Sequence, residues 1–66
     1  METRTLICNR RGHCRRGSWQ PTLPRVEAAR GQRSWEQAAR DSAREFFASR
    51  PGSAFDEVAV LVTNPV

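Results

Sequence analysis

Residues 34–50 constrain the fold most, because they carry the start and stop signals of a single amphipathic helix. Ser34 and Gln37 stand at the spacing of a capping box, in which the Ser34 hydroxyl accepts from the Gln37 main-chain N–H and the Gln37 side chain returns to the Ser34 N–H. Pro51 cannot continue a helix and disfavours helical geometry at Arg50. We therefore predict one helix over 34–50.

The apolar residues of this segment recur at helical spacing. At 100° per residue, one face collects Trp35, Ala38, Ala39, Ser42, Ala43 and Phe46, with Phe47 at its margin. Two pairs of opposite charge fall at stabilising helical spacings, Glu36 with Arg40 and Asp41 with Arg44. The pattern predicts a helix that buries one face and leaves the other in solvent.

A β-branched, almost continuously apolar run at 57–63 predicts a buried strand. Its two faces hold Val58, Val60 and Val62 on one side and Ala59, Leu61 and Thr63 on the other. Residues 3–8 alternate loosely and predict a first strand, and 9–17 is expected to form the loop that follows it.

A second strand is expected between residues 18 and 30. Pro21 and Pro24 confine it to a sheet edge or split it into two pieces. Residues 25–30 are predicted to be extended, because Gly31 follows at once; a short helix begun by Pro24 is the alternative.

These elements predict an α+β fold in one small domain of order β-β-α-β, with a basic hairpin at 3–30, the helix at 34–50 and the last strand at 57–63. We expect a mostly antiparallel three-stranded sheet, in which the third strand lies beside the first and antiparallel to it. One helix covers one face only, so the other face and one edge would be open in a monomer.

Open apolar surface predicts a partner. A chain of 66 residues is near the lower limit for a self-sufficient core, so association would add stability. The residues we expect at such an interface are Trp19, Leu61, Ala59 and Leu6. The main hypothesis is therefore a small non-catalytic protein-interaction or assembly module that forms a homo-oligomer or docks on a larger protein partner.

The charge distribution supports a second hypothesis. The net charge is +4, and residues 1–33 carry eight arginines against two acidic side chains. An arginine-rich nucleic-acid-binding protein would use the 9–17 loop on phosphates, through Arg10, Arg11, Arg15, Arg16 and Arg4. Every basic residue is Arg, which is also typical of codon usage in a high-GC bacterium or its phage, so part of this richness has a mutational explanation.

Cys8, His13 and Cys14 allow three interpretations: a plain loop with free thiols, a disulfide, or part of a zinc site. The second cysteine pair of a zinc site is missing, and the polar N-terminus lacks an apolar signal core. We therefore predict a cytoplasmic protein with reduced cysteines and no metal. One histidine and no phosphate-binding glycine loop give little basis for catalysis. No catalytic residue, cofactor, small-molecule substrate or membrane association is expected.

Overall fold

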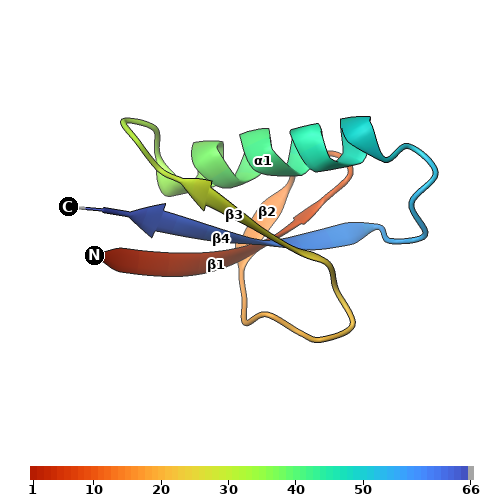
Figure 1. Ribbon diagram of the computed structural model, residues 1–66, viewed down its shortest axis with the longest axis horizontal. Helices are drawn as coiled ribbons and strands as arrows, with labels where there is room; N and C mark the ends of the chain where they lie inside the picture. Colours follow the sequence, from red (N-terminus) through yellow and green to blue (C-terminus); the bar gives the residue numbers. More distant parts are fainter. Residues whose placement is uncertain (66) are drawn as a thin grey trace.

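Four strands form one mixed sheet, and a single helix lies across one of its faces (Figure 1). The structure is a computed structural model that describes residues 1–65. Its elements are β1 (Glu2–Asn9), β2 (Cys14–Arg16), β3 (Arg25–Ala29), α1 (Trp35–Ser49) and β4 (Glu57–Asn64). The strand order is β2-β1-β4-β3, so β2 and β3 are the two edges.

The centre of the sheet is as predicted. β1 and β4 pair antiparallel along their whole length, from Glu2 opposite Asn64 to Asn9 opposite Glu57. β3 runs parallel to β4, and α1 forms the connection between them. The predicted α+β class, the single covering helix and the antiparallel contact of the first and last strands are confirmed.

The predicted number of strands was wrong. The single second strand expected at 18–30 is replaced by β3, which pairs with β4, while β2 pairs antiparallel with β1 on the opposite edge. β2 also falls inside the predicted 9–17 loop. The segment between β2 and β3 contains Pro21 and Pro24, which cannot supply ladder N–H groups, so the chain leaves one edge and starts again at the other.

The N-terminal cap of α1 forms only half of the predicted box. The Gln37 N–H donates to Ser34 Oγ at 3.1 Å, as expected. The Gln37 side chain instead donates through Nε2 to Asp41 Oδ1 at 2.8 Å. Arg33 donates to Oδ2 of the same carboxylate at 3.1 Å, and these two hydrogen bonds lower the pKa of Asp41. Asp41 thus fastens the helix to the segment that precedes it.

The core lies between α1 and one face of the sheet. It contains the three predicted β4 valines, three of the four helix alanines and the two helix phenylalanines, together with Leu6 and Cys8 of β1. Phe47, placed at the margin from the sequence, is only 8% exposed. Leu6 was expected on the open face, and that prediction was wrong: its side chain shares the helix-facing side with Cys8, two residues away.

The opposite face is partly covered by the segment that joins β2 to β3 (Figure 1). Ile7 and Ala59 point to this side and are buried. Gly17 lies against Ile7 so closely that an added Cβ would be 2.9 Å from Ile7 Cγ1. The expectation of a fully open face was therefore wrong, because the irregular segment between β2 and β3 covers part of this face.

Candidate functional site

Most arginine side chains in this structure bind their own chain. Four aromatic rings have an arginine guanidinium 4.3–5.4 Å from the ring centroid. Arg25 lies over Trp19, Arg4 and Arg30 lie over Trp35, Arg50 lies over Phe46, and Arg10 lies over Phe47. Stacked guanidinium groups cover apolar rings while their edges stay in water. The stacked arginine side chains thus extend the packing of a small core.

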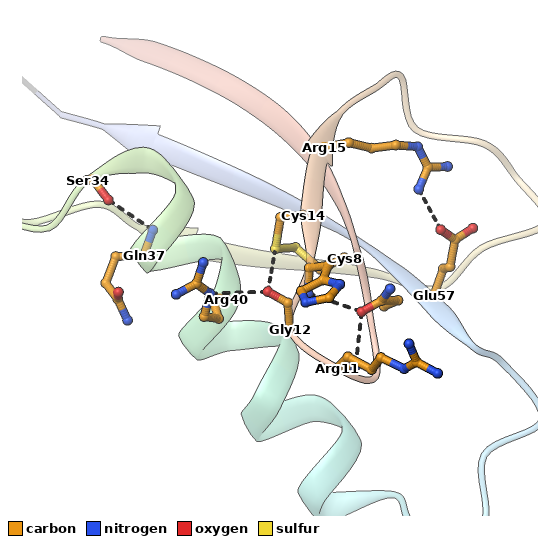
Figure 2. The surroundings of a disulfide bond; sticks show 11 residues. Cys8, Arg11, Gly12, Cys14, Arg15, Ser34, Gln37, Arg40 and Glu57 are labelled. Carbon is orange, nitrogen blue, oxygen red and sulfur yellow. Dashed lines mark hydrogen bonds and ion pairs between the residues drawn. A yellow bond between two sulfur atoms is a disulfide. The ribbon is translucent and has the colours of Figure 1, made fainter.

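The turn between β1 and β2 is held tightly. Asn9 Oδ1 accepts from the N–H groups of Arg11 and His13 at 2.9 and 3.0 Å, and the Gly12 N–H donates to Asn9 O. Gly12 has φ of 83°, which a glycine adopts without strain. Arg40 of α1 donates from Nε to Gly12 O at 3.1 Å (Figure 2). The helix therefore anchors the turn, and the predicted Glu36–Arg40 pair is replaced by this contact.

The five arginines expected to bind nucleic acid do not share one surface. Arg10 donates to the carbonyls of Ser53 and Phe55 and so ties the segment before β4 to the start of the β1–β2 turn. Arg15 pairs with Glu57 on the sheet face away from α1 (Figure 2), and this contact raises the pKa of Arg15.

The other three divide between two places. Arg4 and Arg16 lie on the helix-facing side, where Arg4 also pairs with Glu2. Arg11 stands at the tip of the turn. Within residues 1–65, only Arg11 and Arg16 of the five have no partner for the guanidinium.

Cys8 and Cys14 form a disulfide between β1 and β2, so the prediction of reduced cysteines was wrong for this structure (Figure 2). The two residues are direct partners in the β1/β2 register, with Cα atoms 4.1 Å apart. Neighbouring strands bring opposite residues this close where no main-chain hydrogen bond joins the pair. His13 is exposed on the turn, and the described residues hold no cluster of three metal-ligating side chains.

The predicted interface residues divide into two groups. Leu6 and Ala59 are buried, at 3% and 0% exposure, and cannot meet a partner without unfolding. Trp19 is 44% exposed and Leu61 is half-buried. Leu61 is the register partner of Glu27 on β3, and Trp19 stacks on Arg25 of β3. The two accessible candidates therefore both lie beside β3.

The outer edge of β3 carries unpaired main-chain groups. The Ala59 N–H donates to Pro24 O, and the Arg30 N–H donates to Thr63 O. The even-numbered residues Pro24 and Arg30 therefore direct their main-chain hydrogen-bonding groups towards β4. Because alternate residues of a strand share a direction, Val26 and Ala28 also face β4, whereas Arg25, Glu27 and Ala29 face away from it. No strand pairs with that side in the part of the chain that the structure describes.

One end of this edge is already occupied. Arg33 donates from Nη2 to Ala29 O at 2.7 Å. Besides the Ala29 N–H, the accessible donors and acceptors are thus those of Arg25 and Glu27, residues of opposite charge. Sequence reasoning did not single out this pair; the signal was present as two opposite charges flanking Val26 in a predicted extended segment.

Comparison with models of protein families, with curated proteins and with solved structures finds no match to this chain. Among the described residues, no helix is long and apolar enough to cross a membrane. The candidate site therefore rests on the geometry of the β3 edge.

Proposed function

We propose that this protein is a small non-catalytic assembly module that pairs with a second copy of itself through the β3 edge. The observation that carries the proposal is the self-complementary charge of that edge. When two β3 strands run antiparallel about a two-fold axis at Val26, Arg25 lies opposite Glu27 of the second copy. On the other side of the axis, Glu27 lies opposite Arg25 of the second copy.

The main-chain groups fit the same register. Arg25 and Glu27 both point N–H and C=O away from β4, so the two pairs would exchange four hydrogen bonds and join the sheets into one. Registers shifted towards Ala29 are disfavoured because Arg33 already occupies the Ala29 carbonyl. Val26, half-buried on the helix-facing side, would meet Val26 of the second copy at the axis.

Trp19 supports the pairing from the other face. Its ring lies under the Arg25 guanidinium at 5.1 Å and limits the positions that this long side chain can take. A restrained side chain loses less conformational entropy when it pairs with a carboxylate. We therefore assign Trp19 a positioning role at the interface.

The geometry supports nucleic-acid binding less well. Of the five candidate arginines, Arg10 and Arg15 are held by other segments of the chain, and Arg4 is paired and stacked. Arg11 and Arg16 remain available, which is too small a cationic surface for strong backbone binding.

We also propose that the protein is located in the cytoplasm. Thiols are kept reduced in that compartment, so the Cys8–Cys14 bridge would form there only under oxidation or by exchange with another disulfide, which is reduced in its place. Pairing through β3 does not need the bridge, because the cysteines lie on the opposite half of the sheet.

A charge-reversal series tests the pairing. Arg25→Glu or Glu27→Arg places like charges opposite each other at both symmetric positions, so we expect dimerisation about tenfold weaker for each single variant. The combination of both reversals restores opposite charges and should recover most of the affinity. Sedimentation velocity across a range of protein concentrations measures the change.

Glu45→Arg is the matched control, because it makes the same charge change on an exposed position of α1. It should leave the association unchanged apart from a small general effect of net charge. A wild-type chain that remains monomeric at millimolar concentration, or a double variant weaker than both single ones, would contradict the proposal.

A further inference from the structure

The two sulfur atoms of the disulfide lie in different surroundings. Cys8 is fully buried and has Val58 of β4 as its register partner on the side away from Cys14. Cys14 is half-buried on β2, the edge strand, with no strand beyond it among residues 1–65. The bridge joins directly opposite residues, so Cys14 lies on its side towards the sheet edge and Cys8 on its side towards β4 and the core.

An open cleft of about 400 Å³ adjoins Cys14. Its lining includes Arg4 and Arg16, which share the helix-facing side of the sheet with Cys14, and Trp35 of α1. Glu36 is the acidic residue of the lining. Arg4 is engaged by Glu2, whereas the Arg16 guanidinium is unpaired in the described chain. The cleft therefore brings an unpaired guanidinium and the half-buried Cys14 into one lining.

We propose that the bridge is a redox-active disulfide, that Cys14 is the sulfur at which it exchanges, and that its substrates are thiols carrying carboxylates. Exchange requires a thiolate to approach along the sulfur–sulfur line, and the rate depends on access and on which sulfur is attacked. Access favours Cys14, and Arg16 favours an incoming anion. This inference is independent of pairing through β3.

Two substrate thiols supply the two electrons that reduce the Cys8–Cys14 bridge. A substrate thiolate attacks Cys14 Sγ, the bond to Cys8 Sγ breaks, and Cys8 leaves as a thiolate that takes a proton. A second substrate thiolate then attacks the sulfur of the first, which releases the substrate disulfide and leaves Cys14 as a thiolate. Two substrate thiols are oxidised and the cysteine pair is reduced. Cys8 stays next to the mixed disulfide on Cys14, so the first step should reverse readily without the second thiol.

Site mapping is the first test. The oxidised full chain is exposed briefly to glutathione, quenched with an alkylating reagent at low pH and digested for mass spectrometry. We expect the mixed disulfide on Cys14 and the alkyl group on Cys8. An adduct on Cys8, an even division between the two, or two thiols that an added oxidant fails to join in the folded chain would overturn the proposal.

Charge selectivity is the second test. Reduction rates per thiolate are compared for glutathione, neutral 2-mercaptoethanol and cationic cysteamine, each divided by its rate on the same chain unfolded in urea. We expect glutathione to be favoured over cysteamine, and Arg16→Gln to lower that preference by about threefold, the effect of one charge several ångströms away in water. High salt should weaken the preference in the wild type.

Arg11→Gln is the matched control, since it removes the same charge from the tip of the turn and not from the cleft. Its preference for glutathione should equal that of the wild type. Equal rates for the three thiols in the wild type, or equal losses in the two variants, would contradict the role of Arg16.

Discussion

Phe46→Ala is expected to leave the chain unfolded in buffer at 25 °C. The Phe46 ring is 7% exposed, meets Phe47 edge to face at 5.2 Å between centroids, and is covered by the Arg50 guanidinium. Truncation of a buried Phe costs about 3–5 kcal/mol. A domain of this size has about 3–10 kcal/mol of stability in total, and a chain of only 66 residues buries a small core and lies towards the low end of that range, so this one loss removes most or all of its stability. Far-ultraviolet circular dichroism with urea titration measures the result.

Phe46→Leu is the control for this prediction. Leucine keeps a large apolar side chain on the same helical face, so the variant should fold with a lowered unfolding midpoint. Glu45→Ala, an exposed neighbour on α1, should unfold at nearly the wild-type midpoint. A cooperative, wild-type-like transition for Phe46→Ala would show that the core does not depend on this ring.

Reduction of the Cys8–Cys14 bridge is expected to lower the free energy of unfolding by about 2 kcal/mol, as estimated from the entropy of closing a short loop in the unfolded chain. The sequence separation is only 6 residues, which keeps the effect near the lower end for disulfides. Both sulfur atoms stay within the native packing after reduction, so the fold should persist. Urea unfolding with and without a phosphine reductant gives the difference.

The variant with both Cys8→Ala and Cys14→Ala provides the control. Its unfolding midpoint should not respond to the reductant, which separates loss of the bridge from any effect of the reagent. A wild-type midpoint that is the same under both conditions would mean that the bridge contributes no stability in solution.

Local signals in the sequence were sufficient for the helix and the last strand. The Ser34 cap, the apolar face of α1 and the Pro51 stop involve residues within a few positions of one another, and the structure places all three as predicted. The same holds for the alternation of β4, because side-chain direction in a strand depends only on position.

Pairing between distant segments could not be predicted in this way. Nothing local indicates that β2 joins β1 while β3 joins β4, and the disulfide follows only from the register that places Cys14 opposite Cys8. The unexpected use of arginine has a similar cause. A guanidinium that covers a ring and one that faces solvent have the same residue type, and only the fold distinguishes Arg30 from Arg16.

The most direct test of pairing through β3 is amide hydrogen exchange, followed by nuclear magnetic resonance at low and high protein concentration. Val26 and Ala28 donate to β4 and should be protected at both concentrations, which makes them internal controls. The N–H groups of Arg25 and Glu27 point away from β4, so we expect slow exchange there only at high concentration. Fast exchange of both groups at every concentration would contradict it.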